Sequence, residues 1–164
     1  MTRLLCGNRR SEAVARSNRR GALGTALLML VMTSLAHASP VGLWKTIDDR
    51  TDEATGIIEI TEKDGRLFGQ IVEILDPKAK PDAICGLCTD ERKDAPIVGL
   101  TIIRNVEAND ATSGPWEGGD ILDPNDGKVY RVRLKLADGG NRLEVRGYIG
   151  APMFGRTQVW HRAE

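Results

Sequence analysis

Apolar and polar residues alternate with a period of two over much of the chain after residue 39. The alternation is clearest over residues 128–136, where apolar residues at every second position interleave with basic ones. Asp138-Gly139-Gly140-Asn141 then supplies a turn, and residues 142–149 alternate in the same way. Alternation of this kind is typical of β-strands with one buried face. The two segments therefore predict an antiparallel hairpin.

Further segments of the same character lie on both sides of this hairpin. Asp-Pro pairs at 76–77 and 123–124 end two of them, because proline cannot donate a hydrogen bond to a neighbouring strand. About eight strands with turn signals between them favour an antiparallel barrel or sandwich, and a closed barrel leaves no exposed edge. We therefore predict an all-β, about eight-stranded antiparallel barrel. The other predicted strands are residues 41–47, 57–61, 66–75, 97–103, 116–122 and 156–162.

The first 38 residues have the composition of an export signal. Six arginines and one acid precede residue 21, residues 21–35 carry no charge, and Ala36-His37-Ala38 supplies small residues at the positions that a signal peptidase reads. The apolar run is short for a membrane span, so an uncleaved anchor is the weaker interpretation. We predict cleavage between Ala38 and Ser39, a single mature domain over residues 39–164, and a periplasmic or secreted location reached by a Sec-type signal. Arg19-Arg20 leaves the twin-arginine route open.

Removal of this segment changes the charge and the cysteine content. It takes six of the 23 basic residues and one of the 23 acidic residues, so the mature chain has a net charge of −5. An acidic domain without a basic patch disfavours nucleic acid and an anionic membrane as partners, and no transmembrane span is predicted after processing. Cys6 also leaves, so that Cys85 and Cys88 remain as one pair.

The Cys85-Gly-Leu-Cys88 motif predicts a disulfide that ties a loop, because an isolated cysteine pair usually oxidises outside the cytoplasm. A redox-active pair is the alternative. The motif does not open a helix after a strand, as a thioredoxin-like site would. A structural zinc site needs about four ligands, and no second cysteine pair exists.

Catalytic and metal-binding sets are scarce in the mature chain. His161 is its one histidine, and its serines, Ser39 and Ser113, lie at the terminus and in a Gly-Pro loop. A nucleophilic triad needs a nucleophile, a base and an acid in mutual reach. The acidic segments 48–53 and 123–127 have the composition of turns, and the second lacks calcium-loop spacing. We predict no catalytic residues, no metal and no cofactor.

Gly42-Leu43-Trp44 opens the first predicted strand. With a late arginine, Arg156 or Arg162, over the indole, it resembles the plug that closes one end of lipocalin-type barrels. The other interpretation is a core tryptophan without this role. The resemblance makes the predicted barrel lipocalin-like. Such a barrel is either filled by side chains or holds one small ligand.

The hairpin of residues 128–149 leaves its polar face open to two interpretations. If its apolar residues face a second layer outside the barrel, the polar residues line a cavity and are possible ligand-facing residues. If the apolar residues fill the barrel, the polar residues are solvated, which general burial preferences favour. The residues concerned are Arg131, Arg133, Arg146 and Tyr148.

An ordered series of short motifs covers nearly all of residues 40–162. Taken together, the series is similar to the exported bacterial family known as domain of unknown function 2147. The resemblance implies a β-barrel-like export domain without a settled activity, and it supplies no catalytic residues. The motifs are Pro40-Val-Gly-Leu-Trp44, Lys63-Asp-Gly-Arg-Leu-Phe-Gly69, Cys85-Gly-Leu-Cys88, Pro96-Ile-Val-Gly99, Gly119-Asp-Ile-Leu-Asp-Pro124, Gly127-Lys-Val-Tyr130, Leu143-Glu-Val-Arg-Gly-Tyr-Ile-Gly150 and Gly155-Arg-Thr-Gln-Val-Trp160.

These observations predict a non-enzymatic periplasmic β-barrel. Its partner would be a small apolar or amphiphilic ligand, or another protein of the cell envelope. The alternative is a thiol-redox protein that acts through Cys85 and Cys88.

Overall fold

The computed structural model describes residues 39–108 and 115–163, which form nine strands and two short 3-10 turns. The predicted signal peptide, including Ala38, and Ser113 lie outside the described residues; Ser39 is the first described residue. The strands are β1 (Gly42–Ile47), β2 (Ala54–Lys63), β3 (Arg66–Ile74), β4 (Thr101–Ala108), β5 (Trp116–Glu117), β6 (Asp120–Asp123), β7 (Lys128–Ala137), β8 (Arg142–Tyr148) and β9 (Arg156–Arg162), and the turns are η1 (Asp138–Gly140) and η2 (Pro152–Phe154).

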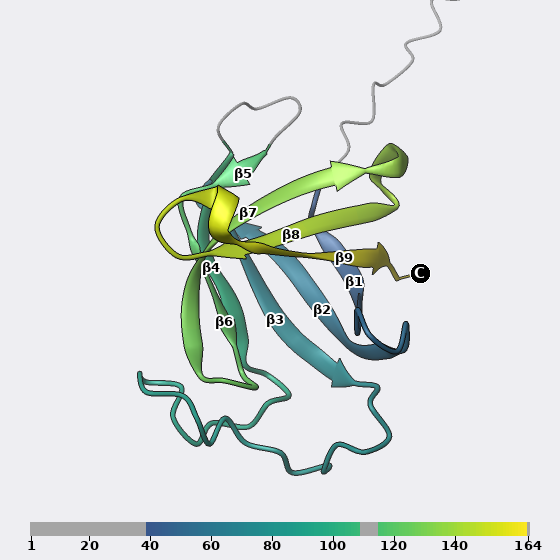
Figure 1. Cartoon of the computed structure of the whole chain (residues 1–164), viewed down its shortest axis with the longest axis vertical. Coiled ribbons are helices and arrows are strands. Elements are labelled where there is room, and N and C mark those ends of the chain that lie inside the picture. Colours follow the sequence, from purple (N-terminus) through teal and green to yellow (C-terminus); the bar gives the residue numbers. More distant parts are fainter. Residues whose placement is uncertain (1–38, 109–114, 164) are drawn as a thin grey trace, which may run out of the picture. The chain divides into compact units, whose positions relative to one another are not determined.

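The strands close into an antiparallel barrel (Figure 1). β1 pairs with β2 and β9, and the pairing of β3 with β4 completes the ring. β5 and β6 both pair with β4 and β7, so they occupy one position that is interrupted at Gly118-Gly119. A Cβ atom at Gly119 would lie 2.2 Å from the carbonyl oxygen of Arg104, which requires glycine at this break. The prediction of an all-β, eight-stranded antiparallel barrel is confirmed.

One predicted strand differs in its position along the chain. Residues 97–103 were expected to form a strand from their apolar run, whereas β4 begins at Thr101 and continues to Ala108. Gly99 has a φ of +92°, and the Leu100 amide donates to the Ile97 carbonyl in a turn. The chain therefore turns before it enters the sheet, and the apolar character of Ile97 reflects packing against the core from a connection.

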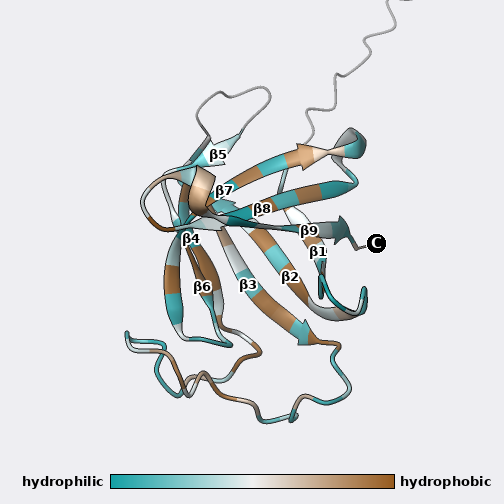
Figure 2. Ribbon diagram, viewed as in Figure 1, coloured by the Kyte–Doolittle hydropathy of each residue, from teal (hydrophilic) through white to brown (hydrophobic). Residues whose placement is uncertain are grey.

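The barrel interior is filled by apolar side chains from all sides of the ring. Val132 and Leu134 of β7 face inward with Leu143 and Val145 of β8, which follows from the two-residue period of the hairpin. Figure 2 shows this alternation along β2, β7 and β8. The interior is close-packed: a Cβ atom at Gly69 would lie 3.0 Å from the Ile103 side chain. The largest fully buried side chains are those of Trp44, Trp160, Ile60, Ile103, Leu122, Leu134 and Leu143.

Candidate functional site

One end of the barrel is closed around Trp44. Its indole Nε1 donates to the carbonyl oxygen of Pro40 at 2.7 Å, and the guanidinium carbon of Arg162 lies 4.3 Å from the ring centroid. Arg162 also donates to the carbonyl oxygens of Val41, Ser39 and Gly140. A cation over an aromatic face is held by the ring quadrupole. These contacts join the first described residues to the last strand and to η1.

Arg156, the other predicted partner of Trp44, lies at the opposite end. Its guanidinium donates to a carboxylate oxygen of Asp49 at 2.6 Å and links the start of β9 to the β1–β2 connection. Arg162 is the register partner of Trp44, whereas Arg156 lies six residues earlier on β9. A strand rises about 3.3 Å per residue, so Arg156 is far from the indole.

We call this opposite end the mouth. Consecutive strands are antiparallel neighbours, so their connections alternate between the two ends of the barrel. The mouth therefore carries the connections 48–53, 75–100, 124–127 and 149–155. The longest of them, 75–100, crosses the lower part of Figure 1, and we call it the lid.

The lid contains the Cys85–Cys88 disulfide, which confirms the predicted pairing. Both cysteines are fully buried and belong to the main apolar core together with Leu100. The Cys85 amide donates to the Ala95 carbonyl at 2.8 Å, and the Asp94 amide donates to the Cys85 carbonyl at 3.1 Å. The disulfide turn is thus part of the packed structure that covers the mouth.

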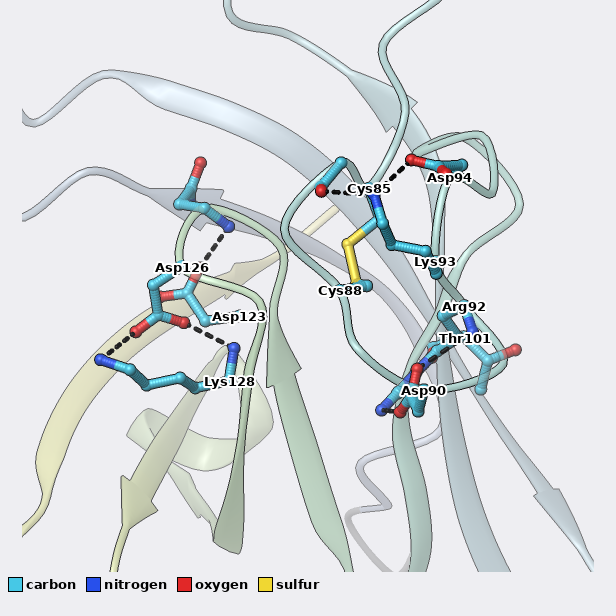
Figure 3. The surroundings of a disulfide bond; sticks show 12 residues. Cys85, Cys88, Asp90, Arg92, Lys93, Asp94, Thr101, Asp123, Asp126 and Lys128 are labelled. Carbon is cyan, nitrogen blue, oxygen red and sulfur yellow. Dashed lines mark hydrogen bonds and ion pairs between the residues drawn. A yellow bond between two sulfur atoms is a disulfide. The ribbon is translucent and has the colours of Figure 1, made fainter.

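The disulfide lies between two polar groups, as Figure 3 shows. On one side is the β6–β7 turn, in which Asp126 accepts hydrogen bonds from the Lys128 amide and from the Tyr130 hydroxyl. The hydrogen bond to Asp126 raises the pKa of Tyr130 to about 12, and the hydrogen bond from Tyr130 lowers the pKa of Asp126. The oxygens of this acidic turn are therefore engaged locally.

The other polar group joins the lid to the barrel wall through two arginines. Arg92 is buried, its guanidinium forms an ion pair with Asp90 of the lid, and its Nη1 donates to the Thr101 carbonyl at 3.0 Å. Arg104 of β4 bonds to Glu91 of the lid and, at 3.1 Å, to Asp120 of β6. The hydrogen bond from Arg92 lowers the pKa of Asp90 to about 2.

We expect Asp90→Asn to lower the free energy of unfolding by about 2 kcal/mol at neutral pH, because it leaves the Arg92 charge buried without its carboxylate. Loss of one partner of a fully buried pair costs about 3–5 kcal/mol, and the partial exposure of Asp90 reduces this value. Urea titration measures the change. Asp94→Asn, at an exposed ion pair with Lys93, is the control and should change stability by less than about 0.5 kcal/mol.

The same pair predicts a pH dependence with a definite sign. The pKa of Asp90 is lowered from 3.8 to about 2 in the folded chain. Its contribution is therefore present above pH 3.8 and is lost as the pH falls from 3.8 through about 2. Asp90→Asn should weaken the acid dependence of stability in this window. An unchanged dependence would contradict the assignment.

The four possible ligand-facing residues lie on the outer face of the barrel, as in the second of the two interpretations, in which the apolar residues fill the interior. Arg131 is the register partner of Tyr148, and Arg133 is the register partner of Arg146, while the residues between them fill the interior. Arg133 forms an ion pair with Glu117. Tyr148 is buried, but outside the main core.

Arg146 has a structural role that sequence reasoning did not find. Its Nε donates to the Pro152 carbonyl at 2.7 Å, and its Nη1 donates to the Thr157 hydroxyl at 2.7 Å. It thereby fixes η2 against β8. An arginine in a strand that is followed by an Ala-Pro turn gives no sequence signal for such a contact.

Two open hollows lie at the lid. Each has a volume of about 350 Å³. One is bordered by Arg92, Leu100 and Arg104, the other by Ile74 and Pro81, and both reach Val98. Both hollows therefore lie where the lid meets the barrel wall.

Groups that would support other chemistry are separated in the described residues. His161 is exposed on β9, and Ser39 bonds to the Val41 amide at the closed end. Over residues 39–108 and 115–163, no three His, Cys, Asp or Glu side chains gather as a metal site would require. In the same residues, no helix has the length and apolar character of a membrane span.

Comparisons with known proteins agree with this architecture. The chain is similar in structure to the Helicobacter pylori protein HP1028, described as belonging to the lipocalin family, with a TM-score of 0.64 and 20% identity over 77% of this chain and 84% of that one. This likeness supports the lipocalin-like fold. No curated protein sequence matches the chain. A family model described as an uncharacterized protein conserved in bacteria matches residues 42–162. The chain therefore belongs to this bacterial family, DUF2147, as its sequence motifs predicted.

Proposed function

We propose that this chain is an exported, non-enzymatic binding protein of the cell envelope, and that it acts through contacts at the mouth of its barrel. The observation that carries the proposal is the filled interior. Trp44, Trp160 and Leu134 occupy the space in which a barrel of this size would hold a ligand, and the lid adds Cys85 and Cys88 to the same core. This favours a protein partner over a small apolar ligand.

The distribution of exposed apolar side chains supports the mouth as the contact surface. Six of the ten large apolar residues that are exposed in the described chain lie on two mouth connections, the lid and residues 149–155. Apolar groups that gather on a surface mark interaction sites more often than scattered ones do. The residues are Ile84, Leu87, Val98, Ile149, Met153 and Phe154.

The position of the disulfide disfavours the thiol-redox alternative. Thiol–disulfide exchange requires a thiolate to reach one of the two sulfurs. Cys85 and Cys88 are both fully buried in the core beneath the lid backbone. Access would require the lid to leave the mouth, so the pair fits a structural role.

Native mass spectrometry of the protein isolated from its own cells tests the proposal. We expect the mass of residues 39–164, less two hydrogens for the disulfide and without a retained small molecule. Binding of benzene or an apolar dye provides a second readout, and Leu134→Ala serves as a positive control because it opens an apolar cavity. The wild type should bind neither probe. A small molecule retained in stoichiometric amount would overturn the proposal and favour the ligand-binding interpretation.

A further inference from the structure

The connection between β8 and β9 presents two large apolar side chains to solvent. Met153 is 77% exposed and Phe154 is 78% exposed, and Ile149 in the same connection is also exposed. We call these three residues the knob. Figure 2 shows the apolar colour of η2 between β8 and β9.

The knob is held by the fold, so its exposure is not the result of a loose loop. Arg146 donates to the carbonyl oxygens of Pro152 and Met153, and the Phe154 amide donates to the Ala151 carbonyl. Gly155 packs so closely on β8 that a Cβ atom there would lie 2.5 Å from the Gly147 carbonyl oxygen. A backbone that is fixed before binding loses less conformational entropy when it binds.

A second apolar surface faces solvent on the lid. Leu87, which lies within the disulfide turn, is 59% exposed, and Ile84 and Val98 in the same connection are also exposed. We call these three residues the lid face. The disulfide and the Ile84–Pro96 bridge hold the lid together internally, and the two arginine contacts join it to the barrel.

The strands beside the knob and the remaining mouth connections differ in charge. Arg146 on β8, which leads into the knob, and Arg131 on the neighbouring strand β7 form no ion pair with any residue of 39–108 or 115–163. Asp120, the register partner of Arg131, is bonded to Arg104. The other three mouth connections, by contrast, contain ten acidic and five basic residues; most of this acidic excess lies in residues 48–53, and the lid has five acidic and four basic residues. Complementary charge orients association and lowers affinity for wrong partners.

We propose that the knob of one molecule docks on the lid face of a second copy of this chain. Both surfaces lie at the mouth, so the contact can be reciprocal: each copy supplies one knob and one lid face around a twofold axis. A reciprocal contact of this kind closes as a dimer. The pairing covers both apolar surfaces and brings two arginines toward an acidic rim. This proposal rests on the proposed function and names a second copy of the chain as one partner that binds at the mouth.

Sedimentation velocity over a wide range of concentrations tests the pairing with the mature, oxidised chain. We expect a reversible dimer whose dissociation constant rises at least about tenfold in Phe154→Ser and in Leu87→Ser. Val159→Ser, an exposed apolar residue on β9 outside both surfaces, is the matched control and should leave the dimer unchanged. Thermal melting of each variant checks that the fold is intact.

Mixing the two variants distinguishes this pairing from other dimers. A mixed dimer of Phe154→Ser with Leu87→Ser retains one intact contact, formed by the unchanged knob and the unchanged lid face. We therefore expect the mixture to associate more tightly than either variant alone. If mixing gives no gain, the knobs do not dock on lid faces and the proposal fails.

A separate variant tests the contribution of charge to the dimer. Arg131→Glu should weaken the dimer, and it should also reduce the loss of affinity that added salt causes in the wild type. A wild type that remains monomeric at its highest soluble concentration would overturn the pairing. If the same protein retains no small molecule, the proposed function would still stand, so the two failures are distinguishable.

Discussion

Replacement of Gly127 by alanine is expected to lower the free energy of unfolding by about 3 kcal/mol, by strain at a backbone position and by overlap with the lid. Gly127 has a φ of +69°, in the left-handed region that side chains disfavour. A Cβ atom there would lie 1.9 Å from the carbonyl oxygen of Leu87. That oxygen belongs to the backbone of the disulfide turn, which cannot rotate away as a side chain can. The β6–β7 turn or the lid must therefore move.

Gly65→Ala separates the two contributions. Gly65 has a similar φ of +72° in the β2–β3 turn, but no atom lies within 4 Å of the position of its Cβ. We expect it to cost only the backbone strain, about 1 kcal/mol. Urea titration of both variants gives the difference. Equal losses would show that the lid does not rest on the Gly127 turn, and amide hydrogen exchange in residues 83–97 would then remain unchanged.

The barrel could be predicted because its strands are half-buried. Alternation places Val132 and Leu134 on one face and Arg131 and Arg133 on the other, whichever way the hairpin turns, and local turn signals mark the ends. To decide which of the two faces points into the barrel, one must also know how the sheet closes. Alternation alone does not show this, which is why the four polar residues of the hairpin remained possible ligand-facing residues.

The lid was beyond sequence reasoning for a different physical reason. Its structure depends on contacts between residues far apart or in irregular backbone, such as Arg104 with Glu91, or Gly127 with Leu87. Such contacts have no periodicity. The same cause explains the error at residues 97–103, where Ile97 and Leu100 are apolar because they reach the core from a connection. The cysteine pair was the exception, since its spacing and predicted compartment suffice to propose a disulfide.

The knob also lacked a sequence signal, although its residues are apolar. Met153 and Phe154 follow a proline in a short connection, and sequence alone does not distinguish an exposed pair from one folded into the core. Their exposure becomes informative only when it is considered together with the contacts that fix η2, because Arg146 and Gly155 hold the loop in one conformation. A fixed and exposed apolar pair is the combination that favours a binding surface.

The plug provides the largest expected loss of stability. Trp44→Ala should lower the free energy of unfolding by about 4 kcal/mol, because it removes a fully buried indole and leaves a cavity at the closed end. It also removes the donor to the Pro40 carbonyl and the ring beneath the Arg162 guanidinium. Arg162 would keep its bonds to the carbonyl oxygens of Ser39 and Val41, so the end of the barrel should loosen without complete detachment of the first residues.

Leu43→Ala is the matched control for this variant, since Leu43 is the neighbour of Trp44 on β1 and points to the opposite, exposed face. We expect it to change stability by less than about 1 kcal/mol. Trp44→Phe should fall between the two, because it retains most of the packing and an aromatic face for Arg162 but loses the hydrogen bond to Pro40. A double-mutant cycle with Arg162→Met isolates the stacking contribution, about 1 kcal/mol at a partly exposed site. If Trp44→Ala and Leu43→Ala lowered the free energy of unfolding by equally small amounts, the indole would not close the barrel. The likeness to a lipocalin plug would then be limited to the sequence motif.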